Sequence, residues 1–121
     1  MPILDVELVL APGETPVSDL AGRLADAAAQ VFGTEARRTW VKLRFIEASL
    51  YAENGGAPVD MFPVFVTVLK SRVPPPDELE AEIGRLTRSL AAVCDRPPEQ
   101  IHLLYQPEAA GRVAFGGNLV R

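Results

Sequence analysis

The first residue along the chain that could do chemistry is Pro2, which follows Met1 and opens the strand-like run at 2–10. Aminopeptidases generally remove an initiator Met that precedes a small residue, and Pro2 would then carry a free secondary amine, a group able to accept a proton. The alternative interpretation is that Pro2 only begins a strand, because proline costs little at that position.

Few other side chains offer chemistry of a common kind. Lys42 and Arg44 are two residues apart in a strand-like run, so both side chains point to the same face. Cys94 and His102 are the single cysteine and the single histidine, so a zinc site of usual composition is not expected and no internal disulfide can form. Absence of a disulfide framework favours a reducing compartment, and we expect a cytoplasmic protein.

Composition excludes several classes of partner. The chain has 121 residues, of which 48% are hydrophobic and 23% charged, as expected of one globular domain spanning 1–121. A net charge of −4 and few aromatic residues make nucleic acid a poor partner. Asp5 and Glu7 interrupt the apolar N-terminal run, so we expect neither a signal peptide nor a membrane segment there.

Four strands and two helices are predicted to position these residues. Alternating apolar residues predict strands at 2–10, 39–47, 63–70 and 101–107. A first helix is predicted from Thr15 as N-cap and Pro16 as first helical residue to Gly33 as its end. The second helix is predicted over 74–95; its acidic first turns, which include Glu82, are expected to be a solvated face matched to the helix dipole.

The chain also shows signs of an internal duplication. One interval separates Pro2 from Pro63, and the same interval separates Gly55-Gly56 from Gly116-Gly117 and Glu47-Ala48 from Glu108-Ala109. We predict two pseudo-repeats, about 1–58 and 59–121, each a right-handed β-α-β unit. Two such units predict an α+β fold with both helices on one face of a four-stranded sheet. The other face, too apolar for water, is expected to meet further copies in a closed symmetric oligomer.

Taken in order, these features resemble the tautomerase superfamily, which includes macrophage migration inhibitory factor, 4-oxalocrotonate tautomerase and malonate semialdehyde decarboxylase. The resemblance rests on the Met-Pro-Ile start, the β-α-β duplication and the ending PEQIHLLYQPEAAGRVAFGGNLV, and it covers nearly the whole chain. It implies a tautomerase/MIF-like fold assembled as a homotrimer, a trimeric barrel.

The resemblance also implies a reaction. In that superfamily the N-terminal proline is the catalyst, which implies a cofactor-independent keto-enol tautomerase or isomerase acting on a small 2-oxo acid or 2-hydroxydienoate, with Pro2 as general base and no metal. Model terminal amines titrate at roughly 7.7 to 8.0, and partial burial with nearby cations would lower the pKa of a secondary amine toward neutrality. Pro63 cannot act in this way because its nitrogen is part of an amide.

Further site residues follow from the same resemblance, each with a simpler alternative. Arg72 is the first choice for binding the substrate carboxylate. Lys42 and Arg44 either approach a neighbouring proline inside the trimer or are solvated or paired with Glu. His102 is a polarising donor or a structural histidine. Phe115 is either the hydrophobic wall of the pocket or a packing residue of the C-terminal hairpin.

Two other functions stay open. The same site could carry decarboxylase or hydratase/dehalogenase chemistry, with Pro2 protonated and acting as general acid. A non-catalytic binding or signalling protein could also use this fold. The sequence departs from its relatives in having Pro12 where 4-oxalocrotonate tautomerase carries a basic residue, and it lacks the Cys-x-x-Cys of macrophage migration inhibitory factor.

Overall fold

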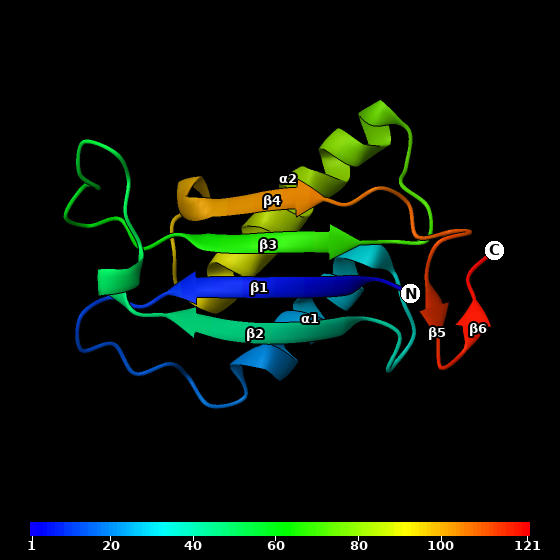
Figure 1. Ribbon diagram of the computed structural model, residues 1–121, viewed down its shortest axis with the longest axis horizontal. Coiled ribbons are helices and arrows are strands. Elements are labelled where there is room, and N and C mark those ends of the chain that lie inside the picture. Colours follow the sequence, from blue (N-terminus) through cyan, green and yellow to red (C-terminus); the bar gives the residue numbers. More distant parts are fainter.

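Helices and strands follow one another as two β-α-β units and a short C-terminal hairpin (Figure 1). The computed structural model describes residues 1–121. The elements are β1 (Ile3–Val9), α1 (Leu20–Phe32), β2 (Trp40–Ile46), the 3-10 turn η1 (Ala48–Leu50), β3 (Val64–Leu69), α2 (Pro76–Cys94), the 3-10 turn η2 (Pro98–Gln100), β4 (Ile101–Tyr105), β5 (Ala114–Phe115) and β6 (Asn118–Leu119).

The main sheet has the strand order β2-β1-β3-β4. Strand β1 is parallel to β2, β3 is parallel to β4, and the two central strands β1 and β3 are antiparallel, with Val6 opposite Val66. Each parallel pair is joined through a helix, as parallel strands require. The predicted α+β fold with a four-stranded sheet and two helices is therefore confirmed.

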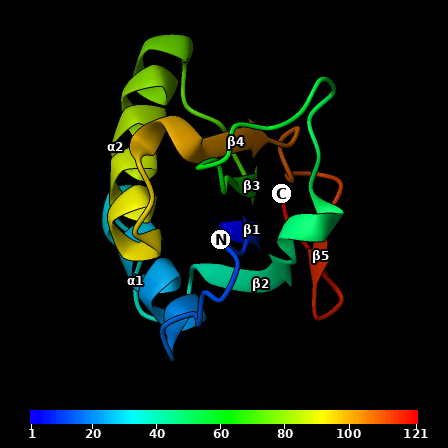
Figure 2. The same cartoon turned by 90° about the vertical axis from the view of Figure 1, so that its left-hand side faces the viewer.

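Both helices cover one face of this sheet, and the other face is left open (Figure 2). The central strands direct every second residue toward the helices, so one face of each is buried, while Asp5 and Glu7 lie on the open face. The largest fully buried side chains are Leu4, Leu8, Leu24, Leu86, Leu90, Val6, Val9, Val64, Val66, Val68 and Pro63. No helix is long and apolar enough to cross a membrane.

The predicted start of the first helix is wrong. Helix α1 begins at Leu20, and the preceding Asp19 has a left-handed backbone with φ of 66° and no side-chain cap hydrogen bond. A left-handed residue breaks the helical path, so Thr15 and Pro16 belong to the connection that leads into the helix. The predicted end is confirmed: Gly33, with φ of 68°, donates its N–H to the carbonyl of Ala29.

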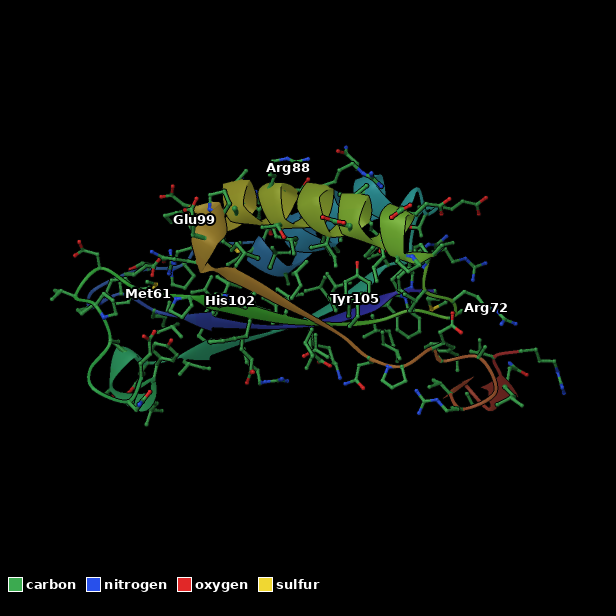
Figure 3. The ribbon with its side chains drawn as sticks, turned by 90° about the horizontal axis from the view of Figure 1, so that it is seen from above. Met61, Arg72, Arg88, Glu99, His102 and Tyr105 are labelled. Atoms are coloured by element: carbon green, nitrogen blue, oxygen red, sulfur yellow. The ribbon has the colours of Figure 1, made fainter.

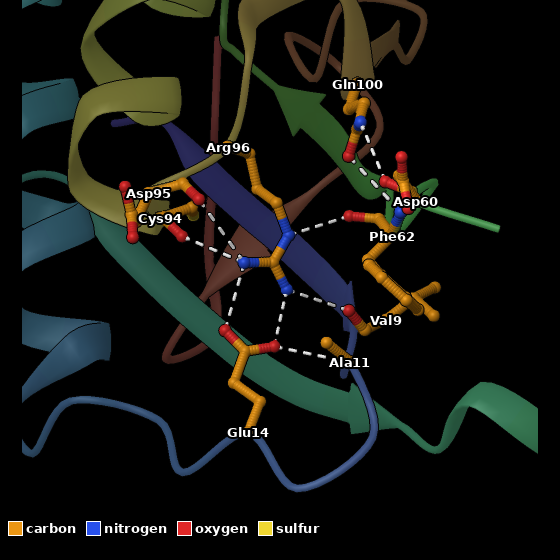
Figure 4. Close-up of polar contacts among 9 residues, drawn as sticks. All are labelled: Val9, Ala11, Glu14, Asp60, Phe62, Cys94, Asp95, Arg96 and Gln100. Carbon is orange, nitrogen blue, oxygen red and sulfur yellow. Dashed lines mark hydrogen bonds and ion pairs between the residues drawn. The ribbon is translucent and has the colours of Figure 1, made fainter.

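An arginine fixes that connection to the rest of the fold (Figure 4). Arg96, just after α2, makes a bidentate ion pair with Glu14, with Nη2 2.7 Å from Oε1 and Nη1 3.0 Å from Oε2. Its Nη2 also donates to the carbonyl of Val9 at 3.0 Å, and its Nε donates to that of Phe62 at 2.7 Å. The guanidinium therefore joins the end of β1, the loop before β3 and the segment before α1.

One prediction about the second helix is also wrong. Glu82 is buried, although the acidic run of α2 was expected to be solvated. Residues four apart share one face of a helix, and Glu82 stands on the same stripe as Leu86 and Leu90, both fully buried. This stripe faces the sheet, so the Glu82 carboxylate is carried inward with it.

Candidate active site at the amino-terminal proline

Pro2 is buried at the start of β1, between the first residue of β2 and the last residues of β3. Its carbonyl accepts the backbone N–H of Trp40 at 3.0 Å. Ile3 pairs with Leu69, so continuing the antiparallel register by one residue sets Pro2 opposite Lys70. By the alternation of the strand, the ring lies on the helix side, next in line to Leu4. In the chain that retains Met1, the nitrogen of Pro2 is part of a peptide bond.

A buried polar cluster lies on the same side of the sheet. The Nζ of Lys70 is 2.8 Å from Oε1 of Glu82, and the hydroxyl of Tyr105 donates to Oε2 of Glu82 at 2.6 Å. The Lys70 side chain is 15% exposed and that of Glu82 is 8% exposed. Lys70 Nζ also stands 4.7 Å from the ring centroid of Phe32. We call Lys70, Glu82 and Tyr105 the Glu82 cluster.

Burial keeps the phenol of this cluster protonated. Burial raises the pKa of Tyr105 far above its ordinary value, and the hydrogen bond to Glu82 and the charge of Glu82 raise it further. Tyr105 therefore acts as a hydrogen-bond donor to the Glu82 carboxylate, a charge-assisted bond of the stronger kind. Figure 3 shows Tyr105 on β4, toward the end of the sheet where Arg72 also lies.

An aromatic pair stands at the same end of the sheet. The rings of Trp40 and Phe115 meet edge to face with centroids 5.3 Å apart, an arrangement typical of favourable aromatic contacts. The indole N–H of Trp40 donates to the carbonyl of Arg37 at 3.0 Å. Because Trp40 is bonded through its backbone to Pro2, the hairpin residue Phe115 is brought close to the proline end of the sheet.

Arg72 follows β3 at this end and is exposed, with its side chain extending outward (Figure 3). The next residue, Val73, donates its N–H to Oε2 of Glu108 at 2.6 Å, which ties the segment after β3 to the segment after β4. The backbone thus holds Arg72 at the Pro2 end of the sheet, while its side chain is exposed.

Lys42 and Arg44 lie on the open face of the sheet and pair with acidic residues of β1. Lys42 Nζ is 3.1 Å from Oδ1 of Asp5, Arg44 Nε is 3.7 Å from Oε2 of Glu7, and Arg44 Nη1 is 4.0 Å from Oδ1 of Asp5. These pairs follow directly from the register, in which Asp5 is opposite Lys42 and Glu7 is opposite Arg44. Within one chain the two cations are thus engaged with carboxylates.

His102 lies on the open face near the start of β4, where its ring is 5.4 Å from that of Phe65. Phe65 is opposite Glu7, near the end of β1 that is remote from Pro2. A strand rises about 3.3 Å per residue, so His102 and Pro2 of the same chain are at opposite ends of the sheet. The structure therefore does not bring His102 to the proline of its own chain.

Comparison with known proteins gives matches by structure alone, since no family model and no curated protein matches the chain. A fused 4-OT, described as an asymmetric trimer, has a TM-score of 0.76 at 18% identity and covers 97% of this chain and 94% of its own. Macrophage migration inhibitory factor from Oncomelania hupensis has a TM-score of 0.75 at 18% identity, with coverage of 100% and 83%. FG41 malonate semialdehyde decarboxylase, inhibited by 3-bromopropiolate, has a TM-score of 0.69 at 18% identity and covers 94% of this chain and 88% of its own.

The chain has the tautomerase-superfamily fold. The identities are low, so the likeness concerns the fold and leaves the specific activity to be inferred from the site. Within this fold, Pro2, Arg72 and Phe115 lie at one end of the main sheet, Lys42 and Arg44 lie on its open face, and His102 lies at its other end.

Sequence reasoning missed the Glu82 cluster in this fold. Lys70 was counted only as the end of a strand and Glu82 as a surface acid. The spacing of Glu82 to Leu86 and Leu90 was the available signal for its burial. Nothing local in the sequence indicates that Lys70 and Tyr105 meet it, because the three residues come from separate elements.

The two cavities of the chain lie away from Pro2. One of about 260 Å³ is lined by Leu8, Glu14, Thr15, Pro16, Val17, Leu20, Val93, Cys94 and Asp95, and one of about 200 Å³ adjoins it at Glu14. Both adjoin the C-terminal end of β1, whereas Pro2 is at its N-terminal end. Neither cavity is lined by Pro2.

Proposed function

We propose that this chain is a cofactor-independent keto-enol tautomerase acting on a small 2-oxo acid or 2-hydroxydienoate, with Pro2 as general base once Met1 is removed. The observation that carries the proposal is the position of Pro2: it is buried immediately before β1 in a tautomerase-superfamily fold. Lys70 and Arg72 follow the strand that pairs with β1 at this end.

In the proposed reaction the Pro2 amine takes a proton from the carbon next to the substrate carbonyl, giving an enol or dienol. The protonated amine then returns a proton to another carbon, so no redox partner is needed. Arg72, extended into solvent, is the group proposed to bind the substrate carboxylate. Phe115 is the proposed apolar wall, held in place by its edge contact with Trp40.

A homotrimer would complete this site. The open sheet face combines the exposed apolar residue Leu104 with the ion pairs of Lys42 and Arg44, a surface suited to a second copy of the chain. Two fused 4-OT structures of the same fold are described as trimers. In such an assembly we propose that Lys42, Arg44 or His102 of one copy approaches Pro2 of the next copy. Within one chain His102 and Pro2 lie at opposite ends of the sheet.

The test is an ultraviolet assay of phenylpyruvate enol and keto interconversion. The mature protein, with Met1 removal checked by intact mass, is compared with the same protein carrying an uncleaved residue before Pro2. We expect turnover only from the mature form. A matched control is Pro63→Ala, which changes a proline whose nitrogen is always an amide. Equal rates for the mature and blocked forms would refute Pro2 as the base.

A second candidate keeps the site but uses protonated Pro2 as general acid, in decarboxylase or hydratase/dehalogenase chemistry. The likeness to FG41 malonate semialdehyde decarboxylase favours testing it. A general base loses rate as the pH falls through its pKa, whereas a general acid loses rate as the pH rises through it, so the pH profile separates the two. A non-catalytic binding protein, the third candidate, predicts that Pro2→Ala leaves function unchanged.

A further inference from the structure

We propose that the Glu82 cluster sets the basicity of the Pro2 nitrogen, with Lys70 and Glu82 acting as positioning residues of opposite electrostatic effect. This inference rests on the proposed function for its catalytic meaning, since both require a free Pro2 amine. Its structural basis is independent of any substrate: an ion pair largely shielded from water, whose Lys70 lies one register step beyond the Ile3–Leu69 pair and so beside Pro2.

The Glu82 cluster differs from a surface ion pair in its burial and in its number of hydrogen bonds. Glu82 accepts two short hydrogen bonds, one on each oxygen, from Lys70 and from Tyr105. Lys70 in turn lies against the ring of Phe32 at the end of α1. Four elements or their ends therefore meet at one carboxylate and one ammonium group: α1, β3, α2 and β4.

The register brings this ion pair to Pro2. Ile3 is opposite Leu69, so Pro2 is opposite Lys70. Side chains directly opposite each other in an antiparallel pair have Cβ atoms about 4.5 to 5.5 Å apart. Lys70 contacts Glu82 and Phe32, which both belong to the helix layer, and Pro2 is buried on that same side. The pair and the proline ring thus share one face and one end of the sheet.

The two charges act on a nearby amine in opposite directions. A neighbouring ammonium disfavours protonation of the amine and lowers its pKa, whereas a neighbouring carboxylate favours protonation and raises it. These effects are strong here because both groups are shielded from water. With the pair intact, Glu82 offsets part of the charge of Lys70, so the basicity of Pro2 depends on the balance between them.

Other charged groups at this end must be counted. Arg38 precedes β2, Arg72 follows β3, and Glu108 follows β4, while Phe32 of α1 brings no charge. Arg38 and Arg72 are exposed, as are Arg37 and Arg112 at the same end, and Glu108 is engaged by the N–H of Val73. Solvent screens the exposed arginines, so Lys70 and Glu82 are the charges of this end with the largest influence on a buried amine.

The experiment is an NMR titration of mature protein labelled with ¹³C and ¹⁵N in proline, with Met1 removal confirmed by intact mass. Of the 11 prolines only Pro2 can titrate, because the others have amide nitrogens. We expect Glu82→Gln to lower the pKa of the Pro2 nitrogen and Lys70→Met to raise it, each by about one pH unit. Glu80→Gln, the same change at an exposed position of α2, is the matched control and should leave the titration in place.

The sign of the two shifts distinguishes electrostatics from packing. A structural role alone would change the stability of both variants without moving the Pro2 titration in opposite directions. Shifts of the same sign, or no shift in either variant whose circular dichroism shows a native fold, would overturn the inference. Opposite shifts without any tautomerase turnover would refute the proposed function and leave the inference standing. Turnover that depends on Pro2, with the Pro2 titration unmoved in both variants, would overturn the inference and leave the proposed function standing.

Discussion

Removing the guanidinium of Arg96 should be among the most costly single changes in the chain. The Arg96 side chain is 8% exposed and donates to both oxygens of Glu14 and to the carbonyls of Val9 and Phe62. Arg96→Ala removes these four hydrogen bonds, and Glu14 keeps only the N–H of Ala11 on its Oε1. Breaking a buried ion pair by removing one partner costs about 3 to 5 kcal/mol. The Glu14 side chain is 26% exposed, so we expect Arg96→Ala to lower the free energy of unfolding by about 3 kcal/mol, the lower end of that range.

The pH dependence of the same contact gives a second readout. The hydrogen bond from Arg96 lowers the pKa of Glu14, with help from the N–H of Ala11 and against the effect of burial. A carboxyl with a lowered folded pKa contributes stability above its unfolded pKa, and that contribution is lost as the pH falls through the folded pKa. Glu14→Gln should therefore make the unfolding free energy fall less steeply as the pH is lowered. Near neutral pH the same change should lower the unfolding free energy by about 1 to 3 kcal/mol.

The assay is urea unfolding followed by circular dichroism, at one protein concentration because subunit association would shift the midpoint. Arg85→Ala, at an exposed position of α2, is the control and should change stability by about 0.5 kcal/mol or less. A cost below about 1 kcal/mol for Arg96→Ala would refute the reasoning, since it falls short of the usual loss on breaking a buried pair. The reasoning would also be refuted if the unfolding free energy of Glu14→Gln fell with decreasing pH as steeply as that of the parent protein.

Three other predictions concern the core, the proposed pocket wall and the single thiol. Leu86→Ala empties a fully buried position and should cost about 2 to 5 kcal/mol by urea unfolding, with a conservative Leu86→Met costing less. Phe115→Ala removes the edge contact with Trp40; tryptophan fluorescence should change and kcat/KM for phenylpyruvate should fall, while an unchanged rate would remove Phe115 from the site. Burial raises the pKa of Cys94 to about 11, so at pH 8 a thiol reagent should react slowly with the native chain and fast in urea; equal rates would contradict its burial.

The strands could be predicted because their burial pattern follows from the local sequence. Alternation of apolar residues reflects the two faces of a sheet, and β1 and β3 follow it closely. The start of α1 could not be predicted in this way. Thr15 and Pro16 carry local signals for a helix start, but the segment is held by Glu14, whose partner Arg96 comes from the far end of the chain. A contact so distant in sequence leaves no local signal.

The same distinction applies to the candidate site. The position of Pro2 after Met1 left two interpretations open, and its proposed role, like that of Phe115, comes from the resemblance to a known family. Glu82 was misread because the acidic residues around it are indeed exposed, and only its spacing to Leu86 indicates an inward direction. The role inferred for Lys70 depends on its contact with Glu82 and its register with Pro2, which only the folded chain provides.

The two ends of the sheet show why one proline is the candidate catalyst and the other is not. At the end of Pro63, all three guanidinium nitrogens of Arg96 donate to protein acceptors, among them Glu14 and two backbone carbonyls. Arg96 thus has no guanidinium nitrogen left for a ligand, so its ion pair with Glu14 is structural. At the end of Pro2, the Lys70 ammonium has three N–H groups and one protein hydrogen bond, to Glu82. Two N–H groups of Lys70 are therefore left over beside the one proline nitrogen that removal of Met1 can free, and this difference accords with the proposed binding of a substrate anion at the Pro2 end.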